Sequence, residues 1–308
     1  MNGSMRIGLA GLGTVGIEVA GRLLHGAVPG VTLTAVCARD RARDRGLDLS
    51  VVRWVDHPVE LAAAGDVDLV VELIGGTGDP AAALIGSALA AGKSVVTANK
   101  ALLAERAMQL AVVSEASGAQ LAYEAAVAGG IPVIKTLREA LAGNKINRIS
   151  GILNGTCNFI LSQMESDGVS FEAALKDAQK FGFAEVEPDL DITGMDAAQK
   201  LALLAGLAFG VQPDVSQISV TGIEAITDQD ISFADEFNSV IRLIAIAGET
   251  PEGLVQCVAP MLVERTHALA QVKNELNAIA LEGTPVGQLF LQGPGAGGGA
   301  TASAVLSD

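Results

Sequence analysis

The length and composition of the chain indicate a protein that can fold without disulfide bonds or structural metal ions. It has 308 residues, of which 50% are apolar, and this is enough for two domains with substantial cores. The formal net charge is −15, with only 20 basic residues spread along the chain, so nucleic acids and anionic membranes are repelled and a small-molecule partner is favoured.

Two further patterns bear on the location of the protein. The longest apolar runs, such as residues 201–211, are shorter than the roughly 18–20 residues of a membrane span, and no basic segment followed by an apolar one opens the chain. Cys37, Cys157 and Cys257 are odd in number and far apart, which argues against disulfides and against a cysteine-based zinc site. We therefore expect a cytoplasmic protein with free thiols.

The first part of the chain alternates apolar segments with helical ones. A strand from Arg6, a glycine turn and an amphipathic helix are followed by predicted strands at 31–38, 67–75, 93–98 and 119–127, with a helical segment at 81–92. Strands that are buried on both faces read as continuous apolar runs, and their alternation with helices implies a parallel sheet.

The pattern changes after residue 132. Residues 144–155 alternate in polarity, helices are predicted around 171–181 and 195–210, and strands are predicted at 218–226 and 254–263. This texture is typical of an α+β domain with a partly antiparallel sheet.

The glycine turn carries the cofactor signal. It reads Gly11-Leu12-Gly13-Thr14-Val15-Gly16, which matches G-x-G-x-x-G, directly after a strand and at the start of a helix. In this context the three glycines allow a tight turn, a close approach to a pyrophosphate and close packing of helix on strand. The predicted fold class is therefore α/β: a Rossmann-type dinucleotide-binding domain with a second α+β domain that binds substrate.

The end of the second strand indicates which dinucleotide is bound. An acidic residue there would hold the ribose 2′-hydroxyl of NAD, whereas an arginine suits the 2′-phosphate of NADP. Arg39 follows the strand at once, which favours NADP. Two alternatives stay open: Arg39 and Arg41 are solvated loop charges, or Asp40 serves NAD.

A dehydrogenase must also move a proton, and several residue types can do so. His25, His57 and His267 have no evident partner in the sequence. Cys157 is a candidate nucleophile of the kind that aldehyde-oxidising dehydrogenases use, although a cysteine in this setting is more often a small apolar filler.

Lys200 is the stronger candidate because of its neighbours. If a helix starts near Gly194, Asp196 and Lys200 lie four residues apart on one face. An exposed ion pair is the alternative, but the helix continues as an apolar run, and four more carboxylates precede it: Glu185, Glu187, Asp189 and Asp191. We interpret the acids as a binder of an ammonium group and the lysine as the group that acts on a hydroxyl or carbonyl.

A second lysine, Lys100, follows the strand predicted at 93–98. Loops at the carboxyl ends of parallel strands form the ligand crevice, so Lys100 is a candidate to contact substrate or cofactor. The alternative is an exposed lysine at the start of a helix.

These residues together resemble the homoserine dehydrogenase family. The resemblance covers residues 5–308, and the segment from Gly182 to Lys200 is its most specific part. The motifs that carry it read GLGTVG, VVELIGG, VVTANKALLA, YEAAVAGGIPVI, ILNGTCNFIL, FAEVEPDLDITGMDAAQK and GPGAGGGATASAVLSD. It implies reversible, NAD(P)-dependent interconversion of L-homoserine and L-aspartate 4-semialdehyde, in the pathway to threonine and methionine.

The resemblance also assigns roles to residues. It implies that Lys200 donates and accepts the proton and that Lys100 lies near both cofactor and substrate. The implied substrate-binding residues are Gly182, Glu185, Asp191 and Asp196. The implied cofactor contacts beyond the glycine turn and Arg39 include Ile74, Gly295 and Gly297, in segments that match the family.

Three features of the family concern the wider architecture. A monovalent cation, usually sodium, is implied at Glu124, Val127, Gly129 and Ile131, and one carboxylate with carbonyl oxygens suits such an ion better than zinc. The nucleotide domain is expected to comprise 5–130 plus 286–308, and residues 131–285 are expected to form the substrate-binding and dimerisation domain of a homodimer. Many bacterial members continue into a regulatory ACT domain beyond the point where this chain stops, so a short form without threonine feedback is expected.

Two rival functions are compatible with parts of the sequence. A phosphorylating semialdehyde dehydrogenase would use Cys157 and need phosphate. A dinucleotide sensor without enzymatic activity would have no use for the carboxylates and lysine between Glu185 and Lys200.

Overall fold

The computed structural model describes residues 4–308 as two compact units. The first unit comprises residues 4–130 together with Ala296–Asp308, and the second comprises Ile131–Gly295. Residues 286–295 were predicted to belong to the nucleotide domain, but they lie in the second unit. Strand β12 (Gly287–Pro294) pairs antiparallel with β11 (Leu276–Thr284), which holds that segment in the second unit.

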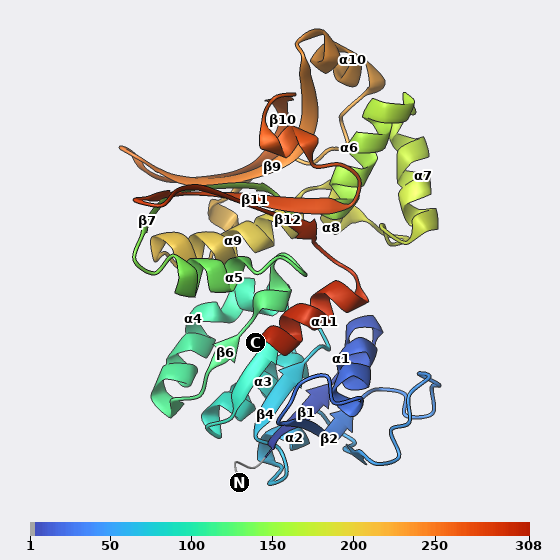
Figure 1. Ribbon diagram of the computed structural model, residues 1–308, viewed down its shortest axis with the longest axis vertical. Helices are drawn as coiled ribbons and strands as arrows, with labels where there is room; N and C mark the ends of the chain where they lie inside the picture. Colours follow the sequence, from blue (N-terminus) through green and yellow to red (C-terminus); the bar gives the residue numbers. More distant parts are fainter. Residues whose placement is uncertain (1–3) are drawn as a thin grey trace. The chain divides into compact units, whose positions relative to one another are not determined.

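The first unit contains a parallel sheet in the doubly wound order β3-β2-β1-β4-β5-β6 (Figure 1). Its strands are β1 (Met5–Ala10), β2 (Val31–Cys37), β3 (Arg53–Trp54), β4 (Leu69–Glu72), β5 (Ser94–Thr97) and β6 (Leu121–Ala122). Its helices are α1 (Thr14–Leu24), α2 (Glu60–Ala63), α3 (Ala81–Ala90), α4 (Lys100–Ser117), η1 (Glu124–Ala126) and α11 (Gly298–Ser307). The predicted Rossmann-type domain is confirmed. In such a sheet the strand order reverses between β1 and β4, and ligands bind outside their carboxyl ends.

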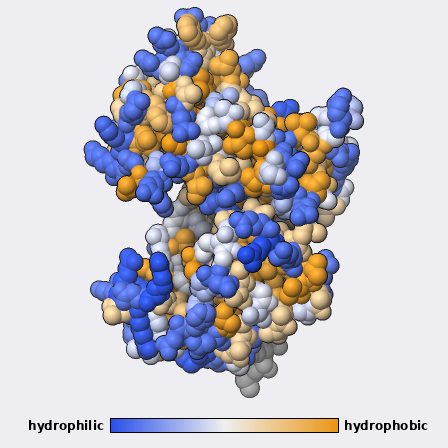
Figure 2. Space-filling model, turned by 180° about the vertical axis from the view of Figure 1, so that it is seen from behind, coloured by the Kyte–Doolittle hydropathy of each residue, from blue (hydrophilic) through white to orange (hydrophobic). Residues whose placement is uncertain are grey.

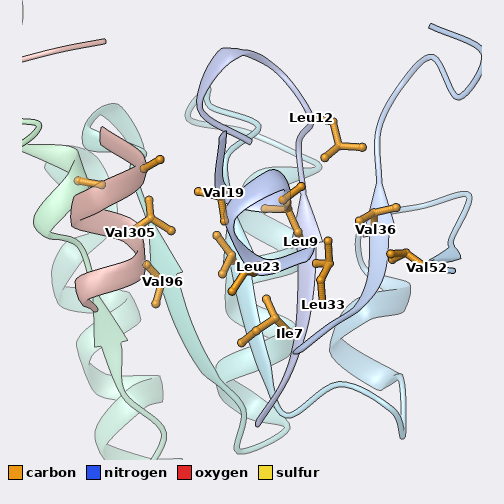
Figure 3. Close-up of a cluster of buried hydrophobic side chains, with 14 of the residues drawn as sticks. Ile7, Leu9, Leu12, Val19, Leu23, Leu33, Val36, Val52, Val96 and Val305 are labelled. Carbon is orange, nitrogen blue, oxygen red and sulfur yellow. The ribbon is translucent and has the colours of Figure 1, made fainter. Parts of the chain in front are cut away.

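The core of the first unit forms because the strands are apolar on both faces. Leu9, Val36 and Val96 come from three different strands and are at most 3% exposed. Val305 of α11 packs into the same cluster, next to Val96 in Figure 3. Burying one such side chain contributes roughly 1.5–3 kcal/mol. The last helix of the chain is therefore a structural part of the first unit.

The strand predicted at 119–127 is much shorter in the structure. Only Leu121 and Ala122 pair with β5, and the chain then turns at Tyr123 into η1. The backbone N–H of Glu124 donates to the Asp308 carboxylate at 2.8 Å instead of to a neighbouring strand. Strand pairing at this edge of the sheet therefore stops before Glu124, whose N–H is satisfied by the side chain of Asp308.

The second unit contains a mixed sheet in the order β12-β11-β7-β9-β10-β8. All of its strand pairs are antiparallel except β8 with β10. The strands not yet given are β7 (Lys145–Ile152), β8 (Ser219–Val220), β9 (Ser239–Thr250) and β10 (Gly253–Glu264). The helices are α5 (Val133–Lys135), η2 (Thr136–Ala140), α6 (Gly155–Asp167), α7 (Phe171–Phe181), α8 (Asp189–Ile192), α9 (Met195–Phe209), η3 (Val215–Gln217), α10 (Asp228–Glu236) and η4 (Ala268–Gln271).

Helices α6 and α9 pack against this sheet, and Figure 1 shows α9 lying along it. The α+β prediction is confirmed, and so are the helices expected around 171–181 and 195–210. The strand predicted at 218–226 is reduced to Ser219–Val220, because Gly222 and Ile223 turn against the chain at Ile192. Strands β9, β11 and β12 and helix α6 were not predicted.

None of the helices formed by residues 4–308 combines the length and the apolar character that crossing a membrane requires.

A partly buried ion network joins α6 to β9 and α10. Arg242 on β9 is 0% exposed and donates to Glu165 of α6 at 2.8 Å. Arg265 donates to the other oxygen of Glu165 at 2.8 Å and to Asp235 of α10 at 2.8 Å. Glu165 accepts from both guanidinium groups. Its negative charge balances the positive charge of Arg242, which is fully buried.

We predict that Glu165→Gln lowers the free energy of unfolding by about 3 kcal/mol, because it leaves the Arg242 charge buried without its counter-charge. Denaturant unfolding of the variant and the wild type measures the difference. Glu249→Gln is the matched control: its partner Lys145 lies 2.6 Å away, but both side chains are exposed, so the change should stay below about 1 kcal/mol. Equal effects of the two substitutions would contradict the assignment.

Candidate active site

The glycine turn between β1 and α1 has a conformation that only glycine suits. Gly11 has φ +101°, and a Cβ atom there would collide with the carbonyl oxygen of Leu73. A Cβ atom on Gly16 would collide with the carbonyl oxygen of Gly11, whereas one on Gly13 would meet nothing within 4 Å. The turn is closed on its inner side and open at Gly13, where the N-terminus of α1 follows. This arrangement fits a dinucleotide pyrophosphate.

The start of α11 approaches the same turn. Gly297 has φ +102°, and a Cβ atom on the next residue, Gly298, would lie 3.0 Å from Cγ2 of Thr14. The first turns of α1 and α11 are therefore neighbours within the first unit. Gly295, which was predicted together with Gly297, lies in the second unit, where a Cβ atom would collide with the side chain of Asn277. Close packing is sufficient reason for a glycine at position 295.

A basic cavity of about 290 Å³ follows the end of β2. The guanidinium carbon atoms of Arg41 and Arg45 lie 5.3 and 5.7 Å from the ring centroid of Trp54, and Arg43 also lines the cavity. Arg39 is exposed beside this loop. Asp40 accepts hydrogen bonds from the backbone of Ala42 and Arg43 at 2.9 and 3.2 Å, so its carboxylate is engaged in its own turn. This grouping of arginines around a tryptophan was not predicted from the sequence.

Lys100 and Ile74 lie at the carboxyl edge of the parallel sheet. Lys100 is the first residue of α4, which Asn99 caps by accepting from the backbone N–H of Leu102 at 3.2 Å. Ile74 follows β4, and its N–H donates to the Glu72 carboxylate at 2.6 Å. Both positions agree with the crevice expected outside the strand ends.

The lysine and the carboxylate predicted as a pair do meet in the second unit, and they are buried. Lys200 and Asp196 are 8% and 7% exposed, and Nζ of Lys200 donates to Oδ2 of Asp196 at 2.7 Å. The same Nζ donates to the carbonyl oxygen of Leu153 at 2.8 Å. The alternative of an exposed ion pair is therefore wrong.

Asn154 organises the carboxylates and was missed by the sequence analysis. Its Nδ2 donates to Asp191 at 2.7 Å and to Asp196 at 2.9 Å, while its Oδ1 accepts from the N–H of Cys157 and caps α6. The only sequence signal was an asparagine before a glycine at the start of a helix. One amide therefore fixes two acids that come from two other helices.

Burial shifts the ionisation of two groups beside this cluster. Desolvation raises the pKa of Asp191 above its usual range, and the hydrogen bond from Asn154 opposes that rise. Burial also raises the pKa of the Cys157 thiol well above its ordinary value, and Asp191 adds to the rise. Cys157 is 0% exposed, and its thiol donates to the carbonyl oxygen of Asp191 at 3.1 Å. A nucleophilic thiolate is disfavoured here, which argues against the phosphorylating rival.

Two of the predicted substrate residues lie in the loop ahead of α8. Gly182 ends α7 with φ +78°, and Glu185 is exposed in the loop that follows. Thr156 of α6 holds this loop by donating to the carbonyl oxygen of Phe183 at 2.6 Å. Glu187 and Asp189 are exposed as well. The structure thus gathers Asp191, Asp196 and Lys200 around Asn154 and leaves the earlier acids facing solvent.

The residues implied for a monovalent cation form a buried stretch of the chain. Glu124 and Val127 are each 1% exposed, Ile131 is 2% exposed, and Gly129 has φ +53°. Within residues 4–308, no group of three or more histidine, cysteine or acidic side chains is placed to hold a metal ion. Glu124, Val127 and Gly129 belong to the first unit, and Ile131 is the first residue of the second.

The three histidines belong neither to the glycine turn nor to the cluster of Asp191, Asp196 and Lys200. His25 contacts the carbonyl oxygen of Gly21 at 2.6 Å, and His267 accepts from the N–H of Leu269 at 3.1 Å. His57 faces the N–H of Val59 at 3.4 Å. These local backbone contacts account for all three.

An open glycine turn on a doubly wound sheet, together with a buried lysine and carboxylates, defines an oxidoreductase that uses a nicotinamide dinucleotide. Comparison with known proteins specifies it further. Residues 132–308 match the family model "Homoserine dehydrogenase", and residues 11–124 match "Homoserine dehydrogenase, NAD binding domain". The chain belongs to the homoserine dehydrogenase family, whose members are NAD(P)-dependent oxidoreductases that act on a CH–OH group.

Individual relatives agree over nearly the whole chain. Homoserine dehydrogenase of Bacillus subtilis is 39% identical over 99% of this chain and 72% of its own, and that of Synechocystis is 41% identical over the same shares. The crystal structure of a homoserine dehydrogenase from Thiobacillus denitrificans matches with TM-score 0.95 at 38% identity, over 99% of this chain and 72% of its own. A hyperthermophilic archaeal homoserine dehydrogenase in complex with NADPH matches with TM-score 0.82 at 28% identity, over 99% and 96%.

We predict that Asp191→Asn raises the free energy of unfolding at neutral pH, because burial raises the pKa of Asp191 and its charge therefore opposes folding. The gain should be present above the raised pKa and should vanish as the pH falls below about 4, where the wild-type carboxyl is neutral in both states. Denaturant unfolding at several pH values measures it. An equal or larger gain at low pH would contradict the explanation.

Proposed function

We propose that this chain catalyses the reversible NAD(P)-dependent interconversion of L-homoserine and L-aspartate 4-semialdehyde, a step towards threonine and methionine. The observation that carries the proposal is the buried Lys200 ammonium, held by Asp196 and the carbonyl oxygen of Leu153. Among the described residues these are its two acceptors, so its third N–H is left for a substrate oxygen.

The mechanism divides the work between the cofactor and the chain. When bound, NAD(P) supplies the hydride acceptor or donor. In the reductive direction Lys200 protonates the oxygen that becomes the hydroxyl of homoserine, and in the oxidative direction it takes that proton back. Asp196 and the Leu153 carbonyl orient the ammonium group of Lys200. Lys100, at the start of α4, contacts cofactor and substrate in this proposal.

The carboxylates bind the amino end of the substrate in this proposal. Asp196 and Glu185 attract the ammonium group, with Asp191 beside Asp196 and Gly182 lining the same pocket. The shared hydrogen bonds of Asn154 support the pairing of Asp191 with Asp196. The exposure of Glu185 supports its contact with a ligand that arrives from solvent.

The cofactor proposed is NADP in preference to NAD. The cavity lined by Arg41, Arg43 and Arg45 offers several guanidinium groups to a 2′-phosphate, and Arg39, which precedes Arg41 by two residues in the chain, is exposed. Asp40 is already engaged by its own turn.

Further proposals concern the cation and the partners. Sodium is proposed at Glu124, Val127, Gly129 and Ile131, and activity in sodium compared with a bulky organic cation tests it. A homodimer through the second sheet is supported by exposed apolar residues on its strands, Val255, Leu262 and Phe290, and sedimentation tests it.

A cytoplasmic location without nucleic-acid binding is also proposed. It is supported by the net charge of −15 and by three free cysteines. Figure 2 shows hydrophilic and hydrophobic residues interspersed over the face that it presents. Fractionation of cells and a nucleic-acid shift assay test the two statements.

We predict that Lys200→Ala lowers kcat by about 10² to 10⁴, because it removes the proton donor and acceptor. Lys200→Arg should fail as well, because a guanidinium group does not release a proton at useful pH. The measurement is the absorbance of reduced cofactor with homoserine, with and without phosphate. A folded Lys200→Ala variant with wild-type kcat would contradict the role of Lys200 in proton transfer. A requirement for phosphate would favour the phosphorylating semialdehyde dehydrogenase.

We predict that Arg39→Ala raises the KM for NADP about tenfold or more and leaves the KM for NAD within twofold, because only NADP carries the 2′-phosphate that the guanidinium would bind. Parallel assays with the two cofactors measure both values. Arg53→Ala is the matched control, since Arg53 is paired with Asp66 and should not affect the cofactor preference. Equal shifts for NADP and NAD would contradict the role of Arg39.

A further inference from the structure

Glu72, the last residue of β4, is a buried carboxylate. It is 0% exposed, and the described residues offer it no ion pair. Its Oε1 accepts from the backbone N–H groups of Ile74 and Gly75 at 2.6 and 3.0 Å, and its Oε2 accepts from the Thr97 hydroxyl at 2.6 Å. Both oxygens of Glu72 therefore act as hydrogen-bond acceptors. Removing such a group from water is costly unless its acceptors are filled, and here three donors fill them.

The loop that Glu72 holds is closed on one side and open on the other. Gly75 and Gly76 have φ +82° and +85°, a conformation that glycine adopts without strain. A Cβ atom on either glycine would meet nothing within 4 Å. The amides of Ile74 and Gly75 therefore point inward to Glu72, while the outer side of the loop is free for a ligand to approach.

The same carboxylate reaches the start of α4 through Thr97. The Thr97 hydroxyl donates to Glu72 and accepts from the N–H of Asn99 at 3.0 Å. The side chain of Asn99 returns to the loop, where its Nδ2 donates to the carbonyl oxygen of Gly76 at 2.8 Å. Thr97 and Asn99 are 0% and 5% exposed. The loop after β4 and the first turn of α4 are thus tied into one closed ring of hydrogen bonds.

The position of this ring in the sheet indicates which part of a ligand it serves. Glu72 pairs in register with Ala10 of β1 and with Thr97 of β5, at the carboxyl end of the sheet where the strand order reverses. In a doubly wound sheet the half formed by the first three strands receives the adenosine end of a dinucleotide, and the other half receives the nicotinamide end. The ring of Glu72, Thr97 and Asn99 belongs to the nicotinamide half.

We propose that Glu72 and Thr97 are positioning residues for the nicotinamide half of the cofactor. They hold the loop at Ile74–Gly76 and the start of α4 in the binding conformation before the cofactor arrives. The proposal rests on the proposed function for the identity of the cofactor. Its physical basis is preorganisation: a glycine loop ordered in advance loses less conformational entropy on binding.

The experiment measures cofactor affinity directly, by calorimetric titration with NADPH, together with separate KM values for cofactor and homoserine. Thr97→Val removes the hydroxyl but keeps the shape, and Thr97→Ser restores it. Thr34→Val is the matched control, because Thr34 of β2 donates to the carbonyl oxygens of Ile7 and Asp66 within the same unit. Glu72→Gln removes the charge and replaces one acceptor oxygen by an NH2 group, so at least one of the three donors from Ile74, Gly75 and Thr97 loses its acceptor.

Thr97→Val and Glu72→Gln should each weaken NADPH binding and raise the cofactor KM about tenfold, with the homoserine KM within twofold of wild type. Thr97→Ser should bind like wild type, and Thr34→Val should lower the thermal midpoint without affecting NADPH binding. Wild-type affinity in folded Thr97→Val and Glu72→Gln overturns the inference, and so does equal weakening in Thr34→Val. Binding needs no turnover, so a wild-type chain that binds NADPH but does not oxidise homoserine contradicts the proposed function alone.

Discussion

The second unit is organised around one electrostatic constraint, the burial of the Lys200 ammonium. A charged amine with 8% exposure is tolerated only when its donors are matched, and Asp196 and the carbonyl oxygen of Leu153 match two of them. Leu153 follows β7, and Asp196 lies in the first turn of α9. The end of a strand and the start of a helix must therefore both be in place before the lysine can be buried.

Sequence patterns predicted the parts of this arrangement that depend on the local spacing of residues. The helix from Met195 and its pair of Asp196 and Lys200 follow from a separation of four residues and an apolar run. The role of Asn154 could not be predicted from the sequence, because its partners Asp191 and Asp196 are 37 and 42 residues away along the chain. Its role arises only when α6, α8 and α9 have packed together.

The fold shows the same division between local and distant information. Parallel strands of the first unit were predicted because each is a short apolar run between helices. Strand β9 is buried along most of its length, and periodicity alone does not separate such a run from a buried helix. Strand β12 alternates in exposure and contains two glycines, so its place beside β11 is decided by pairing and not by local preference. Glu72 had no local signal, since one of its donors, Thr97 of β5, lies 25 residues away along the chain.

The return of α11 to the first unit has a consequence for the order of events during synthesis. Val305 and its neighbours complete a core whose other members lie near the beginning of the chain, and residues 131–295 must be translated between them. A ribosome-bound chain therefore exposes the apolar surface that α11 later covers for the whole time that the second unit is being made. Contacts this distant in sequence close slowly, and open apolar surface of this kind is prone to aggregation. The nucleotide-binding unit, although its translation begins first, is completed only after the second unit has been translated.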